Sequence, residues 1–250
     1  MHARRTDGRL SRRAWLGALV AAGCCPAAVW ASAAWPWSRA WVLDYEVSGR
    51  ARGVPYRASS QLRWEARDWA YTAVLEMRAP LVGTRTQRSE GRIDDRGTLR
   101  PDRFTDQARR EHRYELEWAR QRYRYVREGE PLREGALPAG TQDRLSLFFQ
   151  LGGWAAAQAP RGEASVELPV LGRGGAEPWA FRLTGREAVD TPAGALDAWR
   201  LERQIRAPDD TAITLWLAPA LQYLPARLLL EDDEGHRVDQ RLRRLPAGRD

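Results

Sequence analysis

The sequence contains little from which a reactive or metal-binding site could be built. Lysine is absent, so all 40 basic residues are arginine, which codon bias explains; a selected role for the arginine fork is the alternative. The two cysteines, Cys24 and Cys25, are adjacent and close to the N-terminus. If residues 1–33 are removed, the remaining chain has no cysteine. That excludes a disulfide, a thiol nucleophile and a cysteine metal site, so stability must come from packing.

Other catalytic signatures are missing as well. The three histidines, His2, His112 and His236, have no metal-ligand spacing, and there is no G-x-S-x-G motif or P-loop. Neighbouring carboxylates occur at predicted turn tips, where an acid lacks the burial that raises its pKa for catalysis. We therefore predict a protein that is not an enzyme, with no catalytic residues, no metal and no cofactor.

The positive charge is concentrated in the N-terminal segment. Residues 1–33 hold five arginines and one aspartate, so +4 of the formal net charge of +7 lies there and +3 remains for the rest. Nucleic-acid binding needs basic residues clustered on one face. We therefore predict no nucleic-acid partner.

Residues 1–33 are predicted to be a cleavable signal peptide. Arginines precede an apolar run over 14–29, and Ala31-Ser32-Ala33 supplies small residues for cleavage. No long linker divides residues 34–250, which we interpret as a single β-rich domain. The predicted location is periplasmic.

Two further features bear on export. Ser11-Arg12-Arg13-Ala14-Trp15-Leu16 resembles a twin-arginine signal, which implies export of a folded chain; a general secretion signal is the alternative. Ala21-Ala22-Gly23-Cys24 loosely resembles a lipobox. Lipidation at Cys24 would make the protein an outer-membrane lipoprotein with peripheral membrane contact.

Hydrophobic residues alternate with polar ones from Trp41 onward. Leu43, Tyr45 and Val47 alternate with charged or polar residues, and the same period recurs over 56–64 and 69–77. A period of two indicates antiparallel strands with one buried face. Later strands are predicted at about 163–171, 179–190, 195–206, 211–218, 225–232 and 236–245. The fold class is mainly β: a curved antiparallel sheet or half-open barrel of about a dozen strands.

Residues 111–127 predict a hairpin with a defined register. An even-length loop places Glu115 opposite Arg124 and Glu117 opposite Arg122, so the charges form a solvated face. The opposite face is predicted to hold the apolar side chains Tyr114, Leu116, Trp118, Tyr123 and Tyr125.

The period changes between Gln142 and Gln158. Leu145, Phe148 and Phe149 follow helical spacing, and Thr141 is placed to cap the start. Asp143 in the first turn suits the helix dipole. We predict one amphipathic helix, with a break at Gly152-Gly153 left open, that packs on the concave face of the sheet.

Aromatic residues are the remaining candidates for a site, because 10 of the 12 tryptophans lie outside residues 1–33. Such side chains either fill the core or line an apolar pocket. The residues considered for both roles are Trp64, Trp118, Phe148, Phe149 and Trp216.

Four motifs resemble the DUF3108 family of exported bacterial proteins of unknown function. They are Leu99-Arg100-Pro101 with Phe104, Gln142–Ser146, Thr214–Pro219 and Tyr223–Arg227, within about residues 41–245. The C-terminal pair is also similar to LolA/LolB and RseB-like envelope proteins. That likeness implies a half-open barrel with a helix on its concave face, in relatives that bind acyl chains or lipoproteins.

These observations lead to two functional hypotheses. The first is a non-enzymatic periplasmic protein that binds an apolar or acyl-bearing ligand of the cell envelope: a lipid, a lipoprotein or an envelope polymer. The alternative is a structural or interaction module in envelope assembly, with a filled core and no small ligand. A cavity of several hundred Å³ on the concave face would favour the first.

Overall fold

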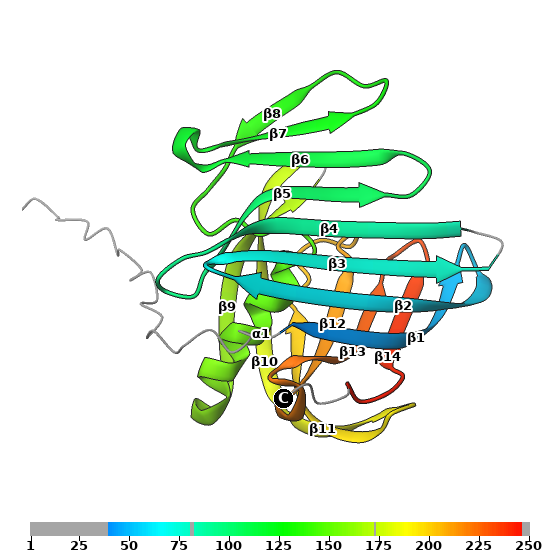
Figure 1. Ribbon diagram of the computed structural model, residues 1–250. Coiled ribbons are helices and arrows are strands. Elements are labelled where there is room, and N and C mark those ends of the chain that lie inside the picture. Colours follow the sequence, from blue (N-terminus) through cyan, green and yellow to red (C-terminus); the bar gives the residue numbers. More distant parts are fainter. Residues whose placement is uncertain (1–39, 81–82, 173, 247–250) are drawn as a thin grey trace, which may run out of the picture.

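The computed structural model describes residues 40–80, 83–172 and 174–246. In this part of the chain, 14 strands form one antiparallel sheet (Figure 1). The strands are β1 (Trp41–Ala51), β2 (Val54–Arg67), β3 (Ala70–Ala79), β4 (Gly83–Ile93), β5 (Leu99–Gln107), β6 (Glu111–Glu117), β7 (Arg122–Arg127), β8 (Arg133–Ala136), β9 (Ala164–Gly172), β10 (Gly175–Thr191), β11 (Gly194–Arg203), β12 (Ala212–Ala218), β13 (Leu224–Glu231) and β14 (Arg237–Leu242). The predicted mainly β fold is confirmed.

The sheet is a meander that is interrupted once. β1 pairs with β14, so the free edges of the sheet are β8 and β9. These two edge strands are consecutive in the chain, and the segment that joins them contains helix α1 (Ser146–Gln158). Because β8 and β9 do not pair with each other, the sheet curls without closing into a barrel. We call β1–β8 the first wall and β9–β14 the second wall.

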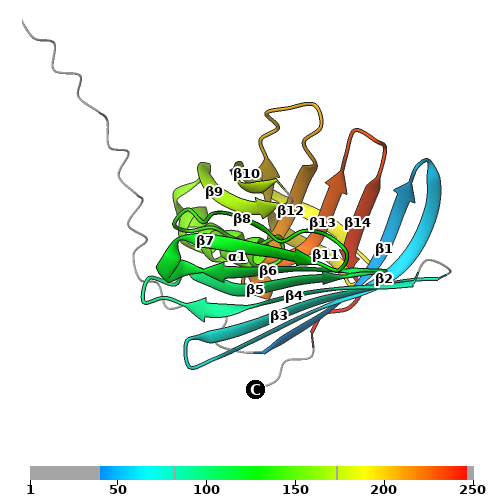
Figure 2. The same ribbon diagram turned by 90° about the horizontal axis from the view of Figure 1, so that it is seen from above.

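Helix α1 lies on the concave side of the sheet, between the two walls (Figure 2). Phe149 belongs to a core cluster with Trp64 and Tyr114 of the first wall. Leu151 belongs to a second cluster with Leu215 of the second wall. The predicted helix on the concave face is confirmed. The buried surface of α1 is wider than the single apolar stripe of an amphipathic helix, because the helix packs against both walls of the sheet. Gly152-Gly153 does not interrupt it.

The start of α1 differs from the predicted position. The backbone of Gln142 pairs with β9: its N–H donates to the Pro169 carbonyl and its carbonyl accepts from the Leu171 N–H, both at 2.8 Å. The chain is therefore extended at residue 142 and can turn into a helix only afterwards. Thr141 does not cap the helix; its hydroxyl donates to the Pro138 carbonyl. Asp143 performs that role, as described below.

The register predicted for the 111–127 hairpin is confirmed. Glu115 lies opposite Arg124 and Glu117 opposite Arg122. The connection has four residues, of which Trp118–Arg120 form the short 3-10 helix η1. Trp118 is therefore in the loop, and its predicted place on the strand is wrong, because the chain leaves the sheet after Glu117. Two other 3-10 helices are η2 (Ala159–Arg161) and η3 (Pro219–Leu221).

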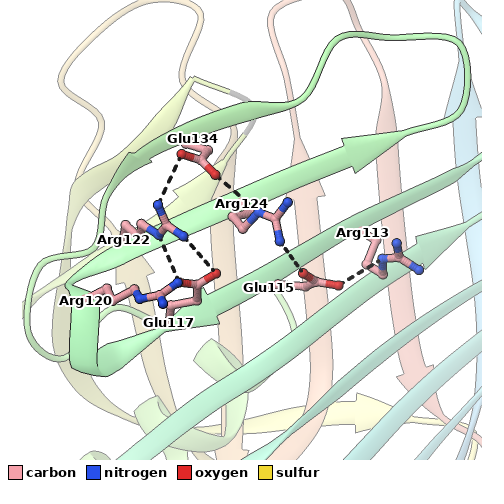
Figure 3. Close-up of polar contacts among 7 residues, drawn as sticks. All are labelled: Arg113, Glu115, Glu117, Arg120, Arg122, Arg124 and Glu134. Carbon is pink, nitrogen blue, oxygen red and sulfur yellow. Dashed lines mark hydrogen bonds and ion pairs between the residues drawn. The ribbon is translucent and has the colours of Figure 1, made fainter.

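The charged face of this hairpin extends to the edge strand β8 (Figure 3). Glu134 lies within 3.5 Å of Arg122 and 3.2 Å of Arg124, and Glu115 bridges Arg124 and Arg113. Exposed ion pairs each contribute little stability. Their arrangement on one face leaves the tyrosines of β6 and β7 buried on the other, as the alternation requires.

Candidate functional site

A cavity of approximately 410 Å³ opens on the concave face beside α1. Leu75 and Met77 of β3 line it from the first wall, and Ile213 and Leu228 line it from the second wall. Phe148 of α1 lies between them. We call this space the apolar cavity. Its aliphatic and aromatic lining is typical of a site for an apolar ligand.

The apolar cavity exists because α1 covers only part of the strands beneath it. Along β3 the inward residues alternate: Tyr71 and Ala73 are buried, whereas Leu75 and Met77 further along are half-buried. Strands of 10 and 14 residues are longer than the diameter of a helix, about 10–12 Å. The inward apolar residues beyond the helix therefore remain available to a ligand.

Polar side chains lie around the apolar lining. Glu231, Asp232 and His236 come from the hairpin between β13 and β14. The Nδ1 atom of His236 is 3.0 Å from an Asp232 carboxylate oxygen. From the other side the lining includes two arginines, Arg85 of β4 and Arg144 just before α1. One edge of the cavity is therefore acidic and the other basic.

A second cavity of approximately 230 Å³ adjoins the first at these arginines. Arg85 and Arg144 line both cavities. The other walls of the second cavity include Asp106, His112 and Tyr114. We call this space the polar cavity. The two cavities together offer an apolar compartment followed by a polar one.

Arg85 is neutralised within the site. Its Nε donates to Asp106 Oδ1 at 2.7 Å and its Nη2 to Asp106 Oδ2, and Gln87 adds a hydrogen bond at 3.2 Å. Burial opposes ionisation of Asp106, but the hydrogen bonds and charge of Arg85 outweigh it and lower the pKa of the carboxyl group. The same hydrogen bond raises the pKa of Arg85. The pair is therefore ionised and has no net charge.

Arg144 differs from Arg85. It is exposed, and its Nη2 lies beside Gly172 of β9. Among the described residues, no carboxylate lies within ion-pair distance of its guanidinium group. The carboxylate of its neighbour Asp143 is fully buried and is used by other donors.

Asp143 holds the start of α1 against the first wall. Its Oδ1 accepts hydrogen bonds from the N–H groups of Leu145 and Ser146, both at 2.8 Å. Its Oδ2 accepts from the Ser89 hydroxyl at 2.6 Å, and the Tyr71 hydroxyl lies 3.0 Å from Ser89. Burial raises the pKa of Asp143 to about 6. Because Asp143 lines neither cavity, we assign it a structural role.

Two glutamines fix the same helix to β5. Gln142 Nε2 donates to the Leu99 carbonyl at 2.8 Å, and Gln150 accepts from the Leu99 N–H at 2.7 Å. Gly91 allows the approach of β5 here, because a Cβ atom on it would lie 2.2 Å from the Arg100 carbonyl oxygen. The motifs at 99–101 and 142–146 are therefore in contact.

The predicted aromatic residues occupy different environments. Trp64 and Phe149 are 0% and 1% exposed and stack with ring centroids 4.4 Å apart, so they form the core. Phe148 is half-buried and lines the apolar cavity. Of the five candidates, Phe148 alone lines either of the two cavities described above.

The other two candidates have polar partners away from both cavities. The Trp118 indole N–H donates to the Pro101 carbonyl at 2.8 Å. Trp216 is on the convex face of β12, opposite to Leu215, and its Nε1 donates to Glu187. The Arg227 guanidinium lies 4.4 Å from the Trp216 ring centroid. These contacts give both indoles a structural role.

Sequence reasoning missed the two arginines of the site. Among 40 arginines, Arg85 and Arg144 have no distinguishing spacing. Arg144 lies within a quoted motif, Gln142–Ser146, which was the one signal that could have drawn attention to it.

The part of the chain that the structure describes has neither a metal-binding cluster nor a helix that could span a membrane. There, no group of three or more His, Cys, Asp or Glu side chains could hold a metal ion. No helix in the same residues is both long and apolar enough to span a bilayer. The predicted signal peptide, residues 1–33, and Cys24 lie outside the described residues.

Comparison with solved structures supports the fold. The chain is similar to a beta-barrel-like protein of domain of unknown function DUF1849 from Brucella abortus, with a TM-score of 0.56 and 12% sequence identity. The similarity covers 84% of this chain and 97% of the other. At this identity the likeness shows the fold alone.

Comparison of sequences identifies the family. No curated protein matches the chain. The profile of DUF3108, described as a protein of unknown function, matches residues 44–242, which include all four quoted motifs. The chain therefore belongs to the DUF3108 family.

Proposed function

We propose that this chain is a non-enzymatic periplasmic protein that binds an apolar or acyl-bearing ligand of the cell envelope. The observation that supports it is the apolar cavity of approximately 410 Å³ beside α1. Sites for small molecules typically have volumes of about 300–1,000 Å³ and apolar linings. The half-buried Leu75, Met77 and Phe148 would be covered by such a ligand.

The ligand class rests on chemistry and on analogy. Leu75, Met77 and Leu228 give the cavity an aliphatic lining that can contact a flexible acyl chain. The predicted likeness to LolA/LolB and RseB-like proteins points to the same class, and a lipid, a lipoprotein or an envelope polymer carrying acyl groups would fit it. The alternative, an interaction module with no small ligand, predicts that the cavity remains empty.

Met77→Trp is expected to weaken binding of an apolar ligand at least tenfold. The larger indole would occupy the cavity, while the half-buried position leaves room for the fold to adjust. The measurement is titration of the purified protein with N-phenyl-1-naphthylamine, whose fluorescence rises in an apolar site, followed by displacement with dodecanol.

Val42→Trp is the matched control. Val42 is 45% exposed on the convex face of β1, next to the buried Leu43. This variant should bind the probe as the wild type does. If the wild type neither binds the probe nor retains a ligand in native mass spectrometry, the interaction module is the better hypothesis.

The proposed location has its own test. N-terminal sequencing of protein from the periplasmic fraction should find a chain that begins after about Ala33, because residues 31–33 supply the small side chains for cleavage. A mature chain that begins at a lipidated Cys24 would instead assign the protein to the outer-membrane lipoproteins.

A further inference from the structure

The ionised groups of the two cavities are almost all paired. Arg85 is bound to Asp106, and Glu231 lies 3.1 Å from Arg237. Asp232 accepts a hydrogen bond from the His236 N–H at 2.8 Å and lies beside its ring. Arg144 is the cavity-lining arginine for which the described residues supply no carboxylate.

Neither the Asp143 carboxylate nor the N–H groups at the start of α1 change this. The carboxylate does not pair with Arg144, and the N–H groups would not bind an anionic ligand in its place. The first N–H groups of α1 already donate to Asp143. Asp143 Oδ2 accepts from Ser89, so the carboxylate next to Arg144 in sequence is not available to it. A charged ligand group at this position would therefore meet the guanidinium side chain and not a free helix terminus.

We propose that the ligand carries an anionic group, a carboxylate or a phosphate, at the end of its aliphatic chain, and that Arg144 binds this group where the two cavities meet. This inference rests on the proposed binding function. The aliphatic chain lies in the apolar cavity against Met77 and Phe148, and the anion lies toward the polar cavity. Arginine is suited to this role because its planar fork can make two hydrogen bonds to a carboxylate or a phosphate.

Exposure of Arg144 agrees with this arrangement. An anionic head group is costly to desolvate, so it is best held where solvent still reaches it, with the chain buried behind it. Arg144 is exposed while its neighbours Asp143 and Leu145 are buried. The site therefore orients the ligand so that its polar end faces solvent at the start of α1.

The experiment compares ligands that share one chain and differ in the head group. Dodecanoate, dodecyl phosphate, dodecanol and dodecyltrimethylammonium are each used to displace N-phenyl-1-naphthylamine from the wild-type protein. We expect one or both anions to bind at least tenfold more tightly than dodecanol, and the cation to bind more weakly than dodecanol. The two anions distinguish a carboxylate from a phosphate ligand.

Arg144→Gln should reduce binding of the preferred anion to the level of dodecanol and leave dodecanol unchanged. Arg57→Gln is the control, because Arg57 is exposed on β2 and follows Tyr56, which lines the cavity on the opposite face. Arg57→Gln should change neither the binding of the preferred anion nor the binding of dodecanol. Thermal melts of both variants confirm that they fold.

The outcomes separate the two proposals. If dodecanol binds but the anions bind no more tightly, or if Arg144→Gln weakens all four ligands alike, the anionic head group is wrong while the apolar site stands. If none of the four binds to the wild type, the binding function itself is wrong and the inference fails with it.

Discussion

Phe149→Ala is expected to lower the free energy of unfolding by about 3–5 kcal/mol. Phe149 is 1% exposed, stacks on Trp64 and belongs to the core cluster that joins α1 to the first wall. Truncation removes the ring contacts and leaves a cavity, because the closely packed helix and first wall cannot move together to fill it. Urea unfolding followed by circular dichroism gives the change directly.

Phe148→Ala is the matched comparison, one residue away on the same helix. Phe148 is half-buried and lines the apolar cavity, so its truncation should cost only roughly 1–2 kcal/mol of stability. It should also weaken binding of dodecanol. If both variants unfold near the wild-type midpoint, α1 is not a fixed part of the core but a movable cover.

The strands could be predicted from the sequence wherever buried apolar residues on one face alternate with polar residues on the other. In β6 and β7 the buried Tyr114, Leu116, Tyr123 and Tyr125 alternate with charged residues, and even the register followed from the charges. Register is well determined in such a hairpin, because a slip of one residue would bury arginine and glutamate.

The alternation does not reveal β4, because its inward residues before Gly91 are polar and Ile93 is the one apolar residue that follows on that face. Arg85 and Gln87 face the cavities and Ser89 bonds to Asp143, so no apolar period marks the strand. Polar inward positions in a β protein arise where a site or a buried network needs them. The hydrophobic pattern therefore finds the strands that supply the apolar lining and misses β4, which supplies the polar residues Arg85 and Gln87.

Long-range pairing could not be predicted from local patterns either. β1 and β14 pair although Tyr45 and its partner Leu242 are 197 positions apart in the sequence, and nothing in either strand specifies the other. The same holds for Gln142, whose pairing with β9 moved the start of α1. The position of Arg144 depends on that start, so the basic part of the site required the fold to be known.

The second large effect concerns Asp143, the buried carboxylate that caps α1. Asp143→Ala would leave the N–H groups of Leu145 and Ser146 and the Ser89 hydroxyl without their acceptor. Loss of a cap costs about 1 kcal/mol, and each buried unpaired group costs about 1–3 kcal/mol. We therefore expect this variant to lose about 3 kcal/mol of stability in urea unfolding at pH 4.5, where the buried carboxyl group of the wild type is protonated.

Asp143→Asn tests the charge without removing the cap. The amide oxygen can still accept from Leu145 and Ser146, and the amide N–H can donate to Ser89 if the serine hydroxyl turns toward Tyr71. The variant keeps the hydrogen-bonding network but does not titrate. Its comparison with the wild type isolates the effect of ionising one buried carboxyl group.

The sign of the pH effect follows from the raised pKa of Asp143. Its pKa rises from 3.8 to about 6 on folding, so between these values the folded state binds a proton that the unfolded state does not. Its favourable contribution is fully present below pH 3.8 and is lost as the pH rises through about 6. Over that range the wild type should lose about 3 kcal/mol relative to Asp143→Asn, of which about 2 kcal/mol falls above pH 4.5.

Asp44→Asn provides a control of opposite sign. A hydrogen bond from Gln61 and the charge of Arg244 lower the pKa of Asp44, so its contribution is present above pH 3.8 and is lost in acid. Urea unfolding of the wild type and both variants between pH 4.5 and 8 should therefore show the difference growing with pH for Asp143 and constant for Asp44. A constant difference for Asp143 as well would mean that this carboxyl group remains ionised in the folded protein, and that the network around it compensates fully for its burial.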